Sequence, residues 1–164
     1  PKKEQVLIDE FSKFDNFFPI ATVELENKGI RVPIHIVHTF FQASNANDEY
    51  FSTGEYGGNF SFEIIENRSR PTFKKEGLKI SDDYKEFLHE AMEKYRSTDR
   101  WYAPINFLSQ PEWWQGDDTP LTDSGGQMKF ICQLDLVDIV DDDCRLFIFF
   151  DVTNNKVRHV YQRD

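Results

Sequence analysis

Two runs of alternating residues joined by a tight turn impose the strongest constraint on this fold. Residues 20–26 and 30–36 place apolar side chains at every second position, as a strand with one buried face does. The Asn27-Lys28-Gly29 link between them suits a tight turn, because Asn and Gly accept a positive φ. The pattern predicts an antiparallel hairpin. We expect Pro33 to lie at a sheet edge or at a bulge, because proline has no N–H to donate to a ladder.

Two other segments have helical spacing. Within residues 6–18 the apolar side chains recur at steps of four, three and four, which predicts a helix that ends at Pro19. A clearer helix is expected over residues 82–95, with Ser81 as its N-cap and two aspartates in its first turn. We expect this second helix to pack on a sheet through one apolar face. Its members are Tyr84, Phe87, Leu88, Ala91 and Tyr95.

Four further strands are predicted, over residues 59–65, 128–134, 146–150 and 157–161. In the second of these, alternation predicts that every second side chain from Met128 to Leu134 points to one buried face. The third is apolar at every position, as a central strand covered on both faces is. Turns or surface loops are expected over residues 44–49, 54–58 and 67–77.

The long stretch of residues 98–126 contains three prolines and all three tryptophans. Irregular runs of this length are uncommon inside a domain unless they are packed or functional, so we expect the tryptophans to hold it against the body. The whole pattern predicts one α+β domain over residues 1–164. It would have a largely antiparallel sheet, one or two packed helices and a long loop rich in Pro and Trp.

The net charge of −10 comes mostly from the second half of the chain. Ten acidic residues lie between Glu112 and Asp151, against only Lys129 and Arg145. Such a field repels phosphate backbones and anionic lipid surfaces, so we expect neither nucleic acid nor a membrane as partner. It is typical either of a solubilising surface or of one that steers a basic protein partner. Two cysteines exclude a disulfide-dense secreted scaffold and favour a reducing cytoplasm.

No set of residues has the spacing of a known reactive centre. Residues 123–126 (Asp-Ser-Gly-Gly) imitate the nucleophile segment of trypsin-like proteases, but the histidine segment of that family is missing. The four histidines and two cysteines have no zinc spacing, and the acidic clusters do not follow a calcium loop. We therefore expect no catalytic residue, metal or cofactor. A pair of carboxylates facing one cleft stays open as an acid–base site.

The adjacent tryptophans Trp113 and Trp114 form the most distinctive feature. Neighbouring side chains of extended backbone point in opposite directions, so we expect one ring in the core and the other at its margin. A marginal tryptophan beside Asp117 and Asp118 would be a plausible anchor for an interface.

One stretch of the chain combines three features: the spacing Pro111-x-Trp113-x-Gln115, an acid before Pro120, and the spacing Met128-x-Phe130-x-x-Gln133-Leu134-Asp135. This combination resembles the YwqG-like family, a domain of unknown function. The resemblance covers about residues 108–152. It supplies no catalytic residue, but members and relatives occur in bacterial toxin–immunity loci, which implies a binding role. By their own chemistry, Gln115 and Gln133 are expected to hydrogen-bond the backbone of the loop.

These observations predict a non-enzymatic cytoplasmic binding protein, most concretely an immunity protein that neutralises a bacterial toxin domain by occlusion. Its partner would be the cognate toxin or another basic protein. The expected partner-binding residues are Trp114, Asp117, Asp118, Asp141, Asp142 and Asp143. One alternative is a small-molecule-binding or hydrolytic domain with a pocket at the Trp113–Gln115 loop. Another is an accessory structural domain with no soluble partner.

Overall fold

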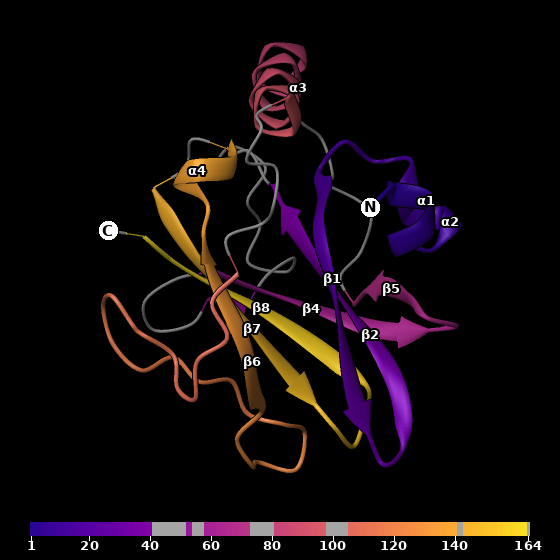
Figure 1. Cartoon of the computed structure of the whole chain (residues 1–164), viewed down its shortest axis with the longest axis vertical. Coiled ribbons are helices and arrows are strands. Elements are labelled where there is room, and N and C mark those ends of the chain that lie inside the picture. Colours follow the sequence, from indigo (N-terminus) through magenta and orange to yellow (C-terminus); the bar gives the residue numbers. More distant parts are fainter. Residues whose placement is uncertain (41–51, 54–57, 73–80, 98–104, 141–142, 164) are drawn as a thin grey trace.

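The chain folds into two antiparallel sheets that pack against each other, with one long helix at their end (Figure 1). The computed structural model describes residues 1–40, 52–53, 58–72, 81–97, 105–140 and 143–163. In chain order the elements are α1 (Lys3–Val6), α2 (Asp9–Ser12), β1 (Phe17–Asn27), β2 (Ile30–Thr39), β3 (Ser52–Thr53), β4 (Gly58–Ile65), β5 (Arg68–Pro71), α3 (Asp82–Ser97), β6 (Lys129–Asp135), α4 (Val137–Val140), β7 (Cys144–Asp151) and β8 (Lys156–Arg163). The predicted α+β class with a largely antiparallel sheet is confirmed.

β1 and β2 form the predicted hairpin, a two-stranded sheet of its own. Both central residues of its turn have positive φ, 53° and 78°, as a two-residue hairpin turn requires. Asn27 pairs with Ile30 beside the turn, and Glu24 pairs with Pro33. Hydrogen-bonded and non-hydrogen-bonded pairs alternate from the turn, so Glu24 and Pro33 form a non-hydrogen-bonded pair. The missing N–H of Pro33 therefore costs the ladder no bond.

The larger sheet has six strands in the order β3-β4-β8-β7-β6, with β5 also paired to β4. β7 lies between β8 and β6, which confirms that the apolar run of residues 146–150 is a central strand. Leu146, Ile148 and Phe150 belong to the main core beneath the hairpin. Phe147 and Phe149 belong to a second cluster and therefore face the other side of the sheet.

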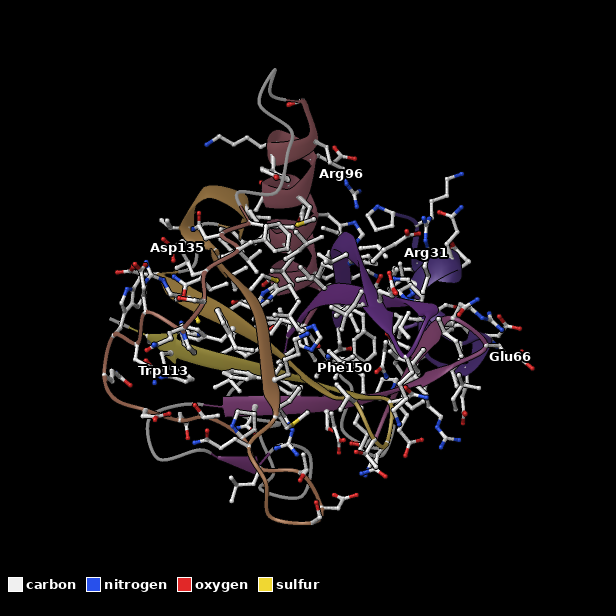
Figure 2. All side chains as sticks on the ribbon, turned by 60° about the horizontal axis from the view of Figure 1, so that its bottom comes forward. Arg31, Glu66, Arg96, Trp113, Asp135 and Phe150 are labelled. Atoms are coloured by element: carbon white, nitrogen blue, oxygen red, sulfur yellow. The ribbon has the colours of Figure 1, made fainter. Side chains whose placement is uncertain are left out.

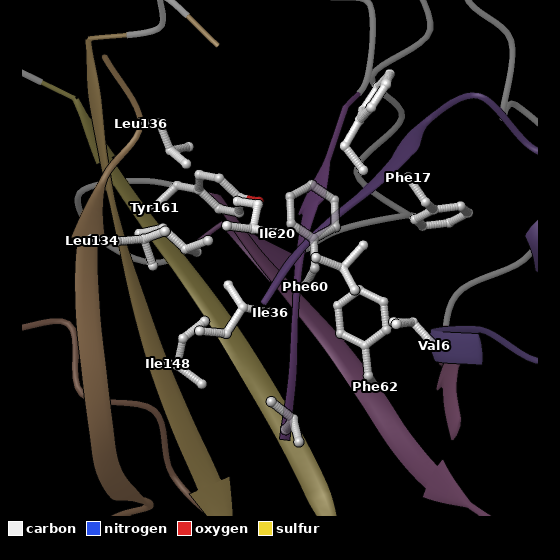
Figure 3. Packing of buried hydrophobic residues seen from close by; sticks show 14 of the residues in the cluster. Val6, Phe17, Ile20, Ile36, Phe60, Phe62, Leu134, Leu136, Ile148 and Tyr161 are labelled. Atoms are coloured by element: carbon white, nitrogen blue, oxygen red, sulfur yellow. The ribbon is translucent and has the colours of Figure 1, made fainter. Parts of the chain in front are cut away.

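The main core fills the space between the hairpin and the large sheet. Ile20 and Ile36 of the hairpin meet Phe62, Leu134 and Ile148 of the large sheet (Figure 3). All five side chains are buried, so the hairpin is held chiefly by removal of apolar surface from water.

The helix predicted over residues 6–18 is wrong. α1 and α2 are single turns, and between them Leu7 forms a parallel bridge with Ser69 of β5. Phe17 begins β1, where its ring meets Phe11 of α2 edge-on at 6.1 Å. Pro19 lies inside β1 at a register shift and ends no helix. The helical spacing is a coincidence, because the phenylalanines reach one core from different elements.

The surface excursion predicted over residues 67–77 begins instead as a strand. Glu66 and Asn67 have φ values of 49° and 64° and make a second tight hairpin turn, which joins β4 to β5. Polar composition concealed this strand, because β5 buries only alternate residues. Residues 73–77 lie outside the described residues, as do the loop predicted over residues 44–49 and residues 54–57 of the next turn.

The predicted alternation within residues 128–134 fails at one point. The register of β6 against β7 shifts between Phe130 and Cys132, so Ile131 is a bulge. Met128 and Phe130 consequently join the second cluster, whereas Cys132 and Leu134 join the main core. One inserted residue thus lets a single strand serve both faces of the sheet.

α3 confirms the predicted helix and extends it to Ser97, with the N–H of Tyr84 donating to Ser81 Oγ at 3.4 Å. Its buried side chains are Leu88 and Met92, and Phe87 is 45% exposed, so the packed face is rotated from the predicted one. The helix stands at one end of the two sheets (Figure 1). Within the described residues, no helix combines the length and apolar character needed to cross a membrane.

Candidate functional site

The stretch of residues 105–128 contains neither a helix nor a named strand and covers the second face of the large sheet. Trp113 holds it there, with its ring centroid 4.4 Å from Phe147 and 5.9 Å from Phe149. Both phenylalanines are fully buried although they point away from the hairpin. The loop therefore supplies the cover that a central apolar strand needs on its second face.

Gln133 of β6 fastens two points of this loop at once. Its fully buried side chain accepts the Glu112 N–H through Oε1 at 2.8 Å and donates through Nε2 to Glu112 Oε2 at 3.1 Å. Its backbone exchanges two hydrogen bonds with Asn106. The expectation for Gln133 is confirmed. Gln115 acts differently, because its amide donates to the Arg163 carbonyl of β8.

Gln162 of β8 is a second buried brace, in addition to the glutamines predicted from the sequence. Its Oε1 accepts the N–H groups of Trp114 and Gln115 at 2.9 and 3.1 Å, and its Nε2 donates to the Gly116 carbonyl at 2.7 Å. A buried amide survives only if its polar atoms find partners, and here the loop backbone provides them. The available signal was a glutamine directly after the strand predicted over residues 157–161.

Arg145 of β7 joins the loop to the edge of the sheet. It donates to both carboxylate oxygens of Asp135, at 2.5 and 3.1 Å, and to the Glu112 carbonyl at 2.9 Å. Its guanidinium carbon lies 4.5 Å from the ring centroid of Trp114. Both tryptophans are half-buried, so neither ring lies fully in the core as predicted for one of them. The rings do contact different groups, because Trp113 packs on the sheet and Trp114 on Arg145. Figure 2 shows Trp113 and Asp135 on the same side of the molecule.

Residues 107–111 form a small lobe at the surface. One end follows Asn106 and the other precedes Glu112, and both of these residues are bonded to Gln133. The lobe presents Phe107 at 63% exposure and Leu108 at 40%. We call five exposed or half-buried side chains between residues 107 and 117 the loop face. Its members are Phe107, Leu108, Glu112, Trp114 and Asp117.

The expected partner-binding acids take different positions. Asp117 is exposed, and hydrogen bonds from the side chain and backbone of Thr119 hold its pKa below the usual range. Asp118 is half-buried, and Asp143 is exposed just before β7. Asp141 and Asp142 lie outside the described residues.

Three other acids of the same region serve the fold. Asp123 pairs with Lys156 at 2.9 Å, and Asp135 pairs with Arg145. Asp151 is buried and accepts the N–H groups of the turn that follows it. Burial opposes ionisation of Asp151, but these bonds outweigh it and lower the pKa. Only part of the acidic excess is therefore free to meet a partner.

A groove of about 790 Å³ lies elsewhere, between α1 and α3. Phe17, Phe18 and Met92 line it together with charged residues of the two helices. Beside it, Asp15 accepts a hydrogen bond from Lys85 at 2.9 Å and lies 3.6 Å from the ammonium of Lys3. Burial opposes ionisation of Asp15, but its cationic neighbours outweigh it and lower the pKa. The Trp113–Gln115 loop does not line this groove.

The buried histidines and cysteines are built into the core. His35 lies between Thr22 Oγ1 and the Asn67 carbonyl, and His159 accepts the Val37 N–H. Burial raises the pKa of Cys132 to about 12, so its thiol stays protonated at neutral pH. Within the described part of the chain, no three His, Cys, Asp or Glu side chains gather as a metal site would require.

Comparison with known proteins found no matching family model, no matching curated protein and no matching solved structure. The resemblance of residues 108–152 to the YwqG-like family therefore stays an expectation based on the motif.

Proposed function

We propose that this chain is a non-enzymatic binding protein whose loop face docks onto a basic protein. The single observation that carries the proposal is the 107–111 lobe, which exposes Phe107 and Leu108. The residues that flank the lobe are both hydrogen-bonded to buried Gln133. Exposed large apolar side chains on a braced loop are typical of an interaction surface.

The bracing favours tight association, because the loop backbone loses little conformational entropy when a partner binds. Gln133 and Gln162 restrain the backbone on both sides of Trp113 before any partner arrives. Binding costs less when the interface is ordered in the free protein. Trp114, covered on one face by Arg145, has the chemistry of an interface anchor, because tryptophan and arginine are enriched at such positions.

The charge of the surroundings favours a basic partner. Glu112 and Asp117 of the loop face are exposed, as is Asp143 just before β7, and the whole chain carries −10. Long-range attraction of this sign raises the association rate of a basic protein and opposes approach of nucleic acid. The most concrete form of the proposal is a cytoplasmic immunity protein that occludes a bacterial toxin domain.

The test uses the product of the gene adjacent to the one that encodes this chain. We expect the two proteins to co-purify and the chain to restore growth of cells that express that product. Phe107→Ala with Leu108→Ala should weaken the complex at least tenfold, because both anchors are lost. Phe87→Ala is the matched control, since Phe87 is also exposed but lies on α3.

Salt dependence tests the charge argument separately. The association rate should fall steeply as NaCl rises, while the dissociation rate changes little. Asp117→Lys should flatten this dependence, and Glu90→Lys on α3 should not. A complex that ignores both the lobe variants and the salt concentration would overturn the proposal.

A further inference from the structure

Two outer strands of the large sheet, β6 and β5, are each bridged by a neighbouring segment within the described residues. Asn106 pairs with the outer edge of β6 at Gln133. Leu7 forms a bridge with Ser69 of β5, and the Ile8 N–H donates to the Ser69 carbonyl at 3.2 Å. At these positions the backbone groups are already paired and cannot bond another chain.

One end of the outer edge of β2, at Val37 and Thr39, is closed by side chains of the large sheet. The Val37 N–H donates to His159 Nε2 at 3.2 Å, and the Thr39 N–H donates to the Tyr161 hydroxyl at 3.1 Å. Further along the same edge, Pro33 has no N–H to offer. Pro33 therefore interrupts the row of donors that β2 could offer to an added strand.

The outer edge of β1 differs. Thr22, Glu24 and Glu26 occupy the non-hydrogen-bonded positions of the hairpin, so their N–H and C=O groups point away from β2. No described residue bonds to these backbone groups. The three side chains are exposed, and no proline interrupts this stretch. A row of free donors and acceptors here is a template for one more strand.

The side chains of β1 define what such a strand must carry. Exposed Glu24 and Glu26 alternate with Val23 and Leu25, which are partly buried against the core. Among the described residues, Glu24 has one weak partner, exposed Arg31 at 3.5 Å, which a cation of the added strand could replace. An added strand would set basic residues beside the glutamates and apolar residues beside Val23 and Leu25.

We propose that the edge of β1 from Thr22 to Glu26 binds an extended segment of a partner protein in which basic and apolar residues alternate. A second copy of this chain fits poorly, because pairing two β1 edges would place glutamates of both chains side by side. This edge is a different surface from the loop face. Figure 2 shows Trp113 and Asp135 on one side of the molecule and Arg31, which pairs with Glu26, on the other.

The probe is a peptide of about seven residues with blocked termini, in which lysine alternates with valine. Main-chain hydrogen bonds supply the affinity of an added strand, and the alternating side chains match those of β1. Two further peptides carry N-methyl groups on either the lysine or the valine amides. Alternate N–H groups of an extended peptide point to opposite edges. In a single register, therefore, either the lysine amides or the valine amides face β1. We expect one methylated peptide to lose at least tenfold in affinity and the other to bind nearly as the parent does. Equal binding of both would overturn the proposal.

The protein variants test the same edge from the other side. Glu24→Pro removes an outward N–H opposite Pro33, so the hairpin ladder loses no bond. It should weaken the parent peptide at least tenfold. Arg31→Pro, at the equivalent position of β2, should change affinity less than twofold. Equal loss in both variants would show that peptide binding follows hairpin damage and would overturn the assignment.

Amide hydrogen exchange supplies a readout that does not depend on any variant. The parent peptide should slow exchange at Glu24 and Glu26 and leave the amides of β5 and β6 unchanged. Protection of other amides instead of these would contradict the proposal. If the free chain self-associates and Glu24→Pro abolishes this, the edge binds a second copy, which would also contradict the proposal. Phe107→Ala should leave peptide binding intact, which separates this edge from the function proposed for the loop face.

Discussion

His159 accepts the main-chain N–H of Val37 through Nε2 at 3.2 Å, and this bond joins the large sheet to the hairpin. The imidazole is fully buried, with the ring of Phe62 edge-on at 4.7 Å. Burial disfavours the charged form and lowers the pKa of His159 to about 3. The ring is therefore neutral at physiological pH, as an acceptor must be.

Acid should destabilise the fold through His159. Its pKa is lower in the folded chain than the ordinary value of 6.5, so the unfolded chain binds more protons between about pH 3 and 6.5. The free energy of unfolding should fall by up to about 1.4 kcal/mol per pH unit below 6.5 and be flat above it. Burial also lowers the pKa of His35, which acts in the same direction. Urea denaturation at pH 7.5, 6 and 5 measures this dependence.

His159→Gln is the control for that experiment. The glutamine Oε1 can accept the Val37 N–H, and the side chain does not titrate. Stability that stays constant from pH 7.5 to 5 in the unmodified chain would contradict the assignment, as would an unchanged slope in the variant.

Gln162→Leu should release the loop from β8. The change leaves the N–H groups of Trp114 and Gln115 and the carbonyl of Gly116 without their partner. We expect a loss of about 3 kcal/mol in the free energy of unfolding, since each unsatisfied group costs on the order of 1 kcal/mol. Gln115→Ala, which removes one exposed bond, should cost less than about 1 kcal/mol. Similar losses in both variants would show that Gln162 is not the brace.

Arg145 and Asp135 should be strongly coupled in stability. Their bidentate pair is largely shielded, since the Arg145 side chain is 14% exposed. A double-mutant cycle with Arg145→Ala and Asp135→Ala should give a coupling of about 2 kcal/mol, as charge-assisted forks do. The matched cycle on Arg31 and Glu24, 84% and 65% exposed, should give less than about 0.5 kcal/mol. Equal coupling in the two cycles would contradict the assigned role of Arg145.

Gly29→Ala should destabilise the hairpin through the backbone alone. Gly29 has a φ of 78°, and a Cβ added there would meet nothing within 4 Å. The free energy of unfolding should fall by about 1 kcal/mol, because the left-handed conformation is strained for an L-residue with a Cβ. Gly126→Ala, at a glycine whose φ is not positive, should stay within about 0.5 kcal/mol. Thermal unfolding of the two variants compares them, and an equal effect would remove the conformational explanation.

Local signals predicted the elements that local chemistry defines. The hairpin of β1 and β2 follows from alternation and a glycine turn, and α3 follows from its N-cap and apolar spacing. Gln133 was singled out because a buried amide beside a loop needs backbone partners. The 107–111 lobe was not foreseen, because Phe107 and Leu108 resemble core residues until the pairing of Asn106 with Gln133 turns them outward.

By itself the amino-acid sequence determined the secondary elements that periodicity and turn residues encode, together with an acidic charge that disfavours phosphate partners. Tertiary structure decided which acids become partners of Lys156 and Arg145, and which backbone groups of β1 receive no bond from any described residue. The physical reason is range. Backbone propensity acts over a few neighbouring residues, whereas Gln162, His159 and Asn106 obtain their roles from partners more than twenty residues away in the chain.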